Sequence, residues 1–253
     1  MRVPLAKPAI YERLKPDDDC MREECGVFGI YTNGSGLDAA EAAYYGLFAL
    51  QHRGQESAGI AVSRKGRIDC HKAMGLVSGR FCDGLGALKG CTFAIGHVRY
   101  STMGDSLLVN AQPLVVESPL GPLALAHNGN IINAKELREE LEAEGVTFQT
   151  TIDSEIIAAL IAKHSKKGLV EGITYAMERL KGSYALVLLT KDQVIGVRDP
   201  KGMRPLALGS LDGAYVFASE SCAFDTIGVE FIRDVRPGEI IIASRAGIKA
   251  HQA

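Results

Sequence analysis

The stretch CGVFGIY, which covers Cys25–Tyr31, is where this chain changes from irregular to strand-like sequence. The residues before it include three prolines and an acidic run at Asp17–Asp19, so we expect no packed element there. After it, short apolar runs separated by glycine follow one another along the chain. We therefore expect a leader over residues 1–24 and one folded domain over residues 25–253.

The composition is that of an ordinary globular protein. The chain has 253 residues, of which 47% are hydrophobic and 23% are charged. Its 28 Lys and Arg against 30 Asp and Glu give a net charge of −2, without the basic excess that is typical of a general nucleic-acid binder. No apolar run approaches the ~20 residues that a membrane-spanning helix needs. We expect neither nucleic acid nor a membrane as a partner.

The cysteines are irregularly spaced, and none forms the C-x-x-C pair that is typical of a structural zinc site. They are Cys20, Cys25, Cys70, Cys82, Cys91 and Cys222. A chain of this length does not need disulfides to fold, and the leader lacks the apolar core of a secretory signal peptide. The six histidines are also scattered without metal-ligand spacing. We expect a reduced, cytoplasmic protein that binds no metal through these residues.

The hydrophobic pattern predicts a mixed α/β protein with many short strands. The predicted strands are Val27–Tyr31, Gly59–Ser63, Thr92–Arg99, Leu123–His127, Ser183–Thr190, Val194–Val197, Ala214–Ala218 and Glu239–Ala243. Some are continuously apolar, such as Tyr184–Leu189, which indicates strands that are covered on both faces. Two sheets with helices outside them satisfy this pattern, although periodicity alone does not distinguish that arrangement from other mixed architectures.

Helices are predicted from capping signals and from apolar residues spaced by three or four. Asp38 with Glu41, and Asn133 with Glu136, match the capping-box pattern at a helix start, and Gly145 is a typical helix stop. The helices are expected from Asp38 through Leu50, from Asn133 to Gly145, and over Ser154–His164 and Val170–Leu180.

Four polar clusters interrupt the apolar segments, at residues 51–56, 97–102, 127–130 and 151–155. Two of them follow the carboxyl ends of predicted strands, where polar groups can converge on a cleft. Each cluster taken singly has a simpler structural explanation. Asn128-Gly129 is a common hairpin turn, and Asp153 would serve as a helix cap.

Taken together with Cys25, these clusters match a known family. The matching stretches are EECGVFGIY, LQHRGQESAGI, IGHVRYSTMG, LAHNGNIINAKELREEL, RDPKGMRPLALG, ASESCAFDTIG and RDVRPGE. Their combination resembles the class II glutamine amidotransferases, which use an N-terminal cysteine as the nucleophile. Within this family, the chain looks like the glutaminase domain of the amidophosphoribosyltransferases, from Glu23 to about residue 245.

The resemblance implies an α+β fold, the four-layer αββα sandwich of N-terminal-nucleophile hydrolases. It also assigns roles to individual residues. By resemblance, Cys25 is the nucleophile, Asn128 and Gly129 form the oxyanion hole, Arg99 holds the glutamine α-carboxylate, Asp153 receives the α-ammonium group, and Arg53, Gly54 and Thr102 line the site. A planar guanidinium suits a carboxylate, which fits the role of Arg99.

The implied activity is hydrolysis of glutamine to glutamate and ammonia through a Cys25 thioester. An α-amine, with a pKa near ~7.7–8.0, is suited to accept the thiol proton, but an internal Cys25 has no free α-amine. The leader over residues 1–24 is therefore expected to be a propeptide that is removed before Cys25.

The resemblance also implies what the ammonia is used for. In the amidophosphoribosyltransferases, ammonia converts phosphoribosyl diphosphate to 5-phosphoribosylamine in the first step of purine biosynthesis. The phosphoribosyltransferase domain of that family is absent from this sequence, so we expect it as a further domain or a partner chain. Mg²⁺, and the iron–sulfur cluster of some members, are expected outside these residues, and the full-length protein is expected to be a homo-oligomer.

Two alternatives stay open at this point. The chain resembles, more distantly, the glutaminase of other class II amidotransferases, such as glucosamine-6-phosphate synthase. A binding module that keeps the fold without catalysis is the other alternative, and the intact set of recognition residues argues against it.

Overall fold

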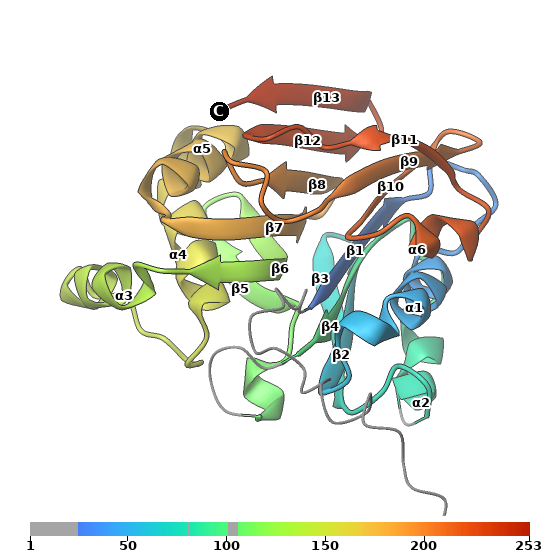
Figure 1. Cartoon of the computed structure of the whole chain (residues 1–253), viewed down its shortest axis with the longest axis horizontal. Coiled ribbons are helices and arrows are strands. Elements are labelled where there is room, and N and C mark those ends of the chain that lie inside the picture. The colour runs from blue at the N-terminus through green and yellow to red at the C-terminus, as the bar shows by residue number, and fades with distance from the viewer. Residues whose placement is uncertain (1–24, 80, 101–105) are drawn as a thin grey trace, which may run out of the picture.

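The computed structural model describes residues 25–79, 81–100 and 106–253. The predicted leader over residues 1–24 and the candidate residue Thr102 lie outside this part of the chain. Two β-sheets pack face to face, and helices cover the outer face of each sheet (Figure 1). The expected four-layer αββα arrangement is confirmed.

The first sheet has seven strands, which pair antiparallel throughout. In spatial order they are β11 (Glu230–Asp234), β9 (Ala207–Leu211), β10 (Ala214–Ala218), β1 (Gly26–Tyr31), β4 (Phe93–Arg99), β2 (Ser57–Arg64) and β3 (Arg67–Met74). The strand that begins at the quoted stretch, β1, therefore lies at the centre of this sheet.

The second sheet has six strands, which also pair antiparallel. In spatial order they are β13 (Gly247–Gln252), β12 (Glu239–Ser244), β8 (Gln193–Arg198), β7 (Gly182–Leu189), β6 (Gly121–Ile131) and β5 (Leu114–Ser118). The long strand β6 contacts both β1 and β4 of the first sheet.

The helices divide between the two outer layers. The first sheet is accompanied by α1 (Ala39–Ala49), α2 (Phe81–Leu85) and α6 (Cys222–Asp225), and the second by α3 (Ala134–Ala143), α4 (Asp153–His164) and α5 (Leu169–Arg179). Short 3-10 helices cover Gln51–Arg53, Gly86–Leu88, Leu108–Asn110 and Ser165–Lys167. No helix in the described ranges is both long and apolar enough to cross a membrane.

Strand β1 shows how the layers are built from sequence. Its side chains alternate, so that Val27 and Tyr31 join the core between the two sheets, while Phe28 and Ile30 join the core under α1. Every residue of β1 is buried, because one face meets the second sheet and the other meets the helices. This is why the sequence of the strand is continuously apolar rather than alternating.

All eight predicted strands are present, and the structure adds β3, β5, β9, β11 and β13. Four of the added strands are the outer strands of the two sheets. Their residues are largely exposed or half-buried, as in β13, where all but the first are exposed. An outer strand has a neighbour on one side only, and these strands therefore lack the apolar run that marks a buried one.

The predicted helices are also present, and Gly145 ends α3 as expected, but only one of the two capping-box interpretations is correct. Asp38 caps α1, because its carboxylate accepts hydrogen bonds from the backbone N–H groups of Ala40 and Glu41 at 3.0 and 3.1 Å. Asn133 precedes α3 without capping it. Its side chain instead accepts from the N–H of Lys181 at 2.9 Å and donates to a carbonyl of the same segment. These two hydrogen bonds hold the start of α3 against the segment between α5 and β7.

The centre of the interface between the sheets has no room for a side chain at Gly29. A Cβ atom there would lie 2.5 Å from Cγ1 of Val187 and 2.9 Å from Cγ1 of Val194, both on the second sheet. We expect Gly29→Ala to lower the free energy of unfolding by roughly 1–3 kcal/mol through overpacking. Urea denaturation measures this change.

Gly86 provides the control. A Cβ atom at Gly86 would meet no atom within 4 Å, so Gly86→Ala should leave the stability unchanged or raise it by roughly 0.4–1 kcal/mol. A Gly29→Ala variant as stable as the parent would contradict the close approach of the sheets.

Candidate active site

Cys25 is buried just before β1, and both its backbone N–H and its carbonyl form hydrogen bonds with Arg53. The N–H of Cys25 donates to the Arg53 carbonyl at 3.0 Å, and Arg53 Nε donates to the Cys25 carbonyl at 2.7 Å. The Cys25 Sγ accepts from the N–H of Tyr100, just after β4, at 3.5 Å. Its φ of 68° lies in the left-handed region, which costs a residue with a side chain about 1–2 kcal/mol.

The guanidinium of Arg53 also reaches a carboxylate. Arg53 is buried, and its Nη1 pairs with Oε1 of Glu220, which follows β10. Burial alone would raise the pKa of Glu220, but the Arg53 hydrogen bond and charge, aided by His52, hold this pKa below its usual value. Glu220 therefore stays ionised and fixes Arg53 against the start of β1.

Arg99, the last residue of β4, is buried and makes a similar pair. Its Nη1 bonds to Oε1 of Glu56, and the Glu56 backbone N–H donates to the Arg99 carbonyl at 3.0 Å. Gly54 fits directly against this strand end, because a Cβ atom at Gly54 would lie 2.7 Å from the Arg99 backbone nitrogen. The first sheet thus brings Cys25, Arg53, Gly54 and Arg99 together.

Asn128 and Gly129 lie inside β6, so the alternative of a hairpin turn at these residues is wrong. Asn128 is fully buried, and neither its amide nitrogen nor its amide oxygen has a hydrogen-bond partner among the residues that the structure describes. Gly129 has a φ of 152°, and a Cβ atom there would lie 2.0 Å from the carbonyl oxygen of Ser183 on β7. The pairing of β6 with β7 therefore admits only glycine at position 129. The neighbouring Asn128 amide keeps N–H donors that no described residue uses.

Asp153 is the first residue of α4 and is buried. It does not act as the N-cap, which is Ile152. Its Oδ2 accepts from the backbone N–H of Ile131 at 2.9 Å, and its Oδ1 lies 3.7 Å from Nδ1 of His127. The carboxylate is thus held beside the strand that carries Asn128 and Gly129.

A histidine links these two groups of residues across the sheets. Nε2 of His97, on β4, lies 2.9 Å from the carbonyl oxygen of His127, on β6, so Nε2 carries the donated proton. Nδ1 of His127 lies 3.0 Å from Oγ of Ser154, which also accepts from Gln112 at 3.0 Å. Gln112 Oε1 in turn accepts from the His127 backbone N–H at 2.8 Å. The polar network fixes β6 relative to β4 and α4.

Burial keeps both histidines neutral. It lowers the pKa of His97 to about 3, against a partly opposing hydrogen bond to the His127 carbonyl. Burial likewise lowers the pKa of His127, although the Asp153 charge opposes this. His97 and His127 are therefore neutral residues of the protein core.

Sequence reasoning assigned no role to several residues that hold the site. Glu56 and Glu220 lie within the quoted motifs, and each is the carboxylate that faces one of the two arginines. A buried arginine needs such a partner, so an acidic residue in another of the quoted motifs was the available signal. Ser154 lies in the polar cluster at residues 151–155, whereas Gln112 had no comparable signal.

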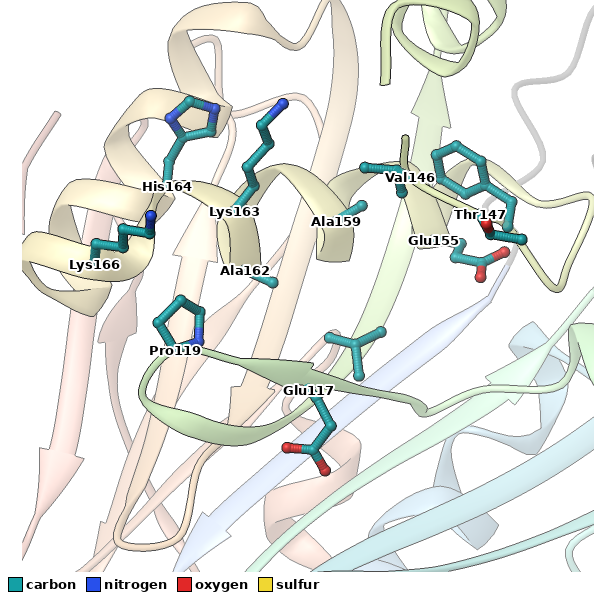
Figure 2. Close-up of a pocket in the computed structure, with 12 residues that line it drawn as sticks. Glu117, Pro119, Val146, Thr147, Glu155, Ala159, Ala162, Lys163, His164 and Lys166 are labelled. Atoms are coloured by element: carbon teal, nitrogen blue, oxygen red, sulfur yellow. The ribbon is translucent and has the colours of Figure 1, made fainter. Parts of the chain in front are cut away.

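The cavity shown in Figure 2 lies elsewhere, between β5 and α4. It has a volume of about 550 Å³ and an apolar floor, with Lys163, His164 and Lys166 toward one end. None of the predicted site residues that the structure describes lines it. Another cavity, of about 670 Å³, includes Asn130, Ser183 and Arg204, and therefore borders the strand pair that carries Asn128 and Gly129.

The chain is similar to known proteins in sequence and in fold. Residues 97–226, just over half of the chain, match the family described as "Glutamine amidotransferase domain". The chain belongs to this family. As an amidotransferase domain it is 49% identical over 241 residues to the amidophosphoribosyltransferase of Synechocystis, covering 92% of this chain and 48% of that protein. It is 50% identical over 220 residues to that of Archaeoglobus fulgidus, covering 86% and 48%. The chain spans about half the length of these relatives.

A solved structure is similar over the same region. The glutamine phosphoribosylpyrophosphate amidotransferase of Bacillus subtilis, complexed with ADP and GMP, is 44% identical, with a TM-score of 0.83. The match covers 90% of this chain and 49% of that one. This similarity confirms the predicted sandwich of the N-terminal-nucleophile hydrolases for this amidotransferase domain.

The low pKa of His97 predicts how the stability of this amidotransferase domain depends on pH. Below the ordinary histidine pKa of 6.5 the unfolded chain binds a proton, but the folded chain does not until the pH nears about 3. The free energy of unfolding should therefore fall as the pH drops between these values, by about 1.4 kcal/mol per pH unit from this group.

His97→Gln keeps a side-chain donor for the His127 carbonyl but removes the titrating group. Urea unfolding at pH 7 and pH 5 should show a smaller loss of stability for this variant than for the parent. His251→Gln, on the exposed strand β13, is the control and should behave as the parent. An unchanged pH slope in His97→Gln would show that folding does not lower the pKa of His97.

Proposed function

We propose that this chain is the glutamine-hydrolysing part of an amidophosphoribosyltransferase. The observation that carries the proposal is the amide of Asn128, which is fully buried and has no partner for either polar atom in the described part of the chain. A buried donor without a hydrogen-bond partner lowers the stability of the folded protein by about 1–3 kcal/mol. Such a donor is therefore expected where a bound ligand supplies the missing acceptor. A glutamine side chain attacked by a thiol develops an oxyanion that Asn128 and the Gly129 N–H would stabilise.

In the proposed reaction, the Cys25 Sγ attacks the side-chain amide carbon of glutamine. The thiol proton passes by way of the Cys25 α-amine to the leaving nitrogen, ammonia departs, and a glutamyl thioester remains on Cys25. Water then hydrolyses the thioester to glutamate and restores the thiol. Holding each donor in place before the reaction lowers the cost of charge development, and one such donor is typically worth about 2.7–4 kcal/mol.

The charged ends of free glutamine match the remaining residues. Arg99 is proposed to bind the α-carboxylate, which would share the guanidinium with Glu56. Asp153 is proposed to accept the α-ammonium group, and its fixed bond to the Ile131 N–H supports this because the carboxylate is already oriented. Arg53, Gly54 and Thr102 are proposed to line the site, with Thr102 outside the described residues.

Substitution of the proposed catalytic residues tests the function. Cys25→Ala should reduce glutamine hydrolysis to background with little loss of stability, and Cys91→Ala, at another buried cysteine, should leave it unchanged. Asn128→Ala should lower kcat by about 10²–10³-fold. Since this substitution removes an unpaired buried amide, the free energy of unfolding of Asn128→Ala should not fall below that of the parent. A steady-state glutaminase assay measures kcat, and urea denaturation measures the stability.

The substrate-binding residues should behave differently. Arg99→Ala and Asp153→Ala should lower kcat/KM for glutamine by a factor that corresponds to roughly 2–5 kcal/mol, because each leaves a substrate charge unpaired. Full activity in Cys25→Ala would refute the assignment of Cys25 as the nucleophile. An unchanged kcat/KM in both Arg99→Ala and Asp153→Ala would refute the proposed orientation of glutamine in the site.

The proposed mechanism needs a free α-amine on Cys25. Two features support cleavage before this residue. The nitrogen of Cys25 already has an acceptor, the Arg53 carbonyl at 3.0 Å, which would hold a released amine beside the thiol. Cleavage also removes the preceding peptide unit and with it the unfavourable φ of 68°.

We therefore expect the active protein to begin at Cys25. Intact-mass measurement and N-terminal sequencing of active material should show the loss of residues 1–24. The unprocessed chain, separated from it, should be inactive because an amide nitrogen has no basicity to accept the thiol proton. An active species that still begins at Met1 would contradict the α-amine mechanism.

The ammonia acceptor is proposed to lie on a phosphoribosyltransferase domain or partner chain. The curated relatives are about twice as long as this chain, which supports a second functional part. That part would bind phosphoribosyl diphosphate with Mg²⁺, and an iron–sulfur cluster, where a full-length relative has one, would also lie outside these residues. The full-length assembly is proposed to be a homo-oligomer.

The two half-reactions should be coupled, because ammonia released into water is protonated and lost as a nucleophile. We expect this chain alone to hydrolyse glutamine slowly and to form no phosphoribosylamine. Adding the phosphoribosyltransferase part with phosphoribosyl diphosphate should raise the glutaminase rate. Equal steady-state rates with and without these additions would show an uncoupled glutaminase.

A further inference from the structure

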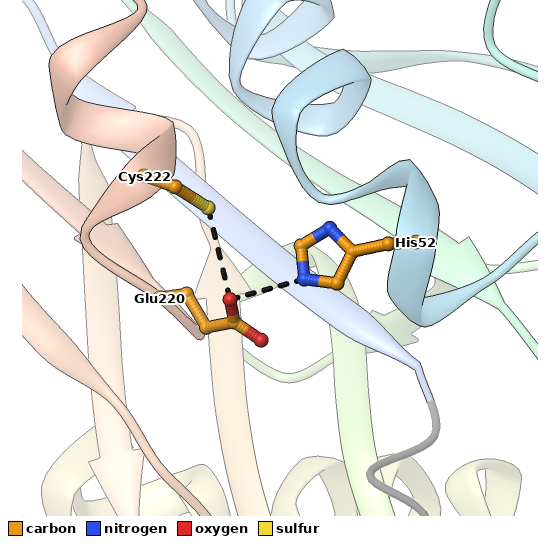
Figure 3. A group of neighbouring side chains, drawn as sticks. All are labelled: His52, Glu220 and Cys222. Atoms are coloured by element: carbon orange, nitrogen blue, oxygen red, sulfur yellow. Dashed lines mark hydrogen bonds and ion pairs between the residues drawn. The ribbon is translucent and has the colours of Figure 1, made fainter.

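His52, Glu220 and Cys222 form a cluster of three different metal-binding side chains (Figure 3). His52 comes from the 3-10 helix after α1, Glu220 follows β10, and Cys222 begins α6. Their ligand atoms all lie within 4.8 Å of one another. The cluster joins residues about 170 positions apart, so sequence spacing gave no sign of it.

Two of the three distances in the cluster are close to those of a tetrahedral site. Nε2 of His52 lies 3.0 Å from Oε2 of Glu220, and Sγ of Cys222 lies 3.7 Å from the same oxygen. Bonds of about 2.0–2.3 Å to Zn²⁺ place neighbouring ligand atoms roughly 3.3–3.6 Å apart in a tetrahedron. The remaining pair, Nε2 of His52 and Sγ of Cys222, lies within 4.8 Å, so these two side chains would approach each other by up to about 1.2 Å on binding.

The orientation of His52 also suits a ligand. Its Nδ1 lies 3.0 Å from the Ala49 carbonyl oxygen, which accepts only, so Nδ1 carries the proton. Nε2 faces Oε2 of Glu220 at 3.0 Å, so a proton or a metal ion lies between these two atoms. A backbone carbonyl that fixes the other ring nitrogen is also the usual support of a metal-bound histidine.

Glu220 can serve the cluster without releasing Arg53. Arg53 pairs with Oε1, whereas His52 and Cys222 both face Oε2. The side chain of His52 is 56% exposed and that of Glu220 35% exposed, so the cluster is open to an ion from solvent. Its fourth position is left for water, as in zinc sites with three protein ligands.

We propose that His52, Glu220 and Cys222 form a binding site for Zn²⁺. The combination of imidazole nitrogen, carboxylate oxygen and thiolate sulfur favours a borderline-soft divalent cation over Mg²⁺ or Ca²⁺, which prefer oxygen ligands. The Glu220 carboxylate would bind the ion through one oxygen and Arg53 through the other. Arg53 in turn donates to the Cys25 carbonyl. Binding does not depend on the proposed glutaminase activity.

The test measures metal binding by the full chain in a Cys25→Ala background, which removes the thiol of the candidate active site. Competition with a chromophoric chelator should give one tightly bound Zn²⁺ that is lost on substituting Cys222 or His52. Substituted Co²⁺ should show the absorption of a tetrahedral site with one thiolate ligand. Cys222→Ser and His52→Ala should each weaken Zn²⁺ binding by more than about 100-fold.

Cys82→Ser, at an exposed cysteine of α2, is the matched control and should bind Zn²⁺ as tightly as the background protein. Circular dichroism of the metal-free variants checks folding, and the exposed His52 provides a substitution with little effect on packing. The proposal is overturned if the background protein binds no Zn²⁺ at micromolar concentration, or if Cys222→Ser and His52→Ala bind it as tightly as Cys82→Ser.

Discussion

The separation between the two sheets is the constraint on which the candidate site depends. At Gly29 the facing sheet is so close that two valines occupy the space of a missing Cβ atom. Elsewhere in the same interface, His97 spans the gap with one hydrogen bond to the carbonyl of His127. Close apolar contact and one buried polar bond together set the distance from β4 to β6. Because the proposed nucleophile belongs to one sheet and the proposed oxyanion donors to the other, the same distance sets the geometry of the chemistry.

Most charged groups of the site are held by protein partners already. Arg53 faces Glu220, Arg99 faces Glu56, and Asp153 accepts from a backbone N–H. These contacts restrict side chains whose rotamer freedom would otherwise be lost on substrate binding. Asn128 differs, since its buried amide has no partner among the described residues. The site thus combines restrained charges with one donor group reserved for a ligand.

The sequence was sufficient to predict the central strands, because strands such as β1 and β7 are buried on both faces and are therefore apolar throughout. It was insufficient for the outer strands, whose residues contact neighbours on one side and solvent on the other. Site residues came from the motif resemblance, since single residues such as Asp153 are equally typical of helix starts. The carboxylate partners and the His52 cluster depend on contacts between distant segments, and local patterns carry no information about those.

Arg53 shows what a planar, forked cation does that a point charge cannot. One edge of its guanidinium donates to the Cys25 carbonyl, and another nitrogen pairs with Glu220. The side chain therefore joins the beginning of β1 to the segment after β10 in two fixed directions. A lysine would preserve the charge, but its single nitrogen at the end of a flexible stem could not hold both directions in one plane. The requirement at this position is one of shape, and an exchange that conserves charge would still separate the two segments.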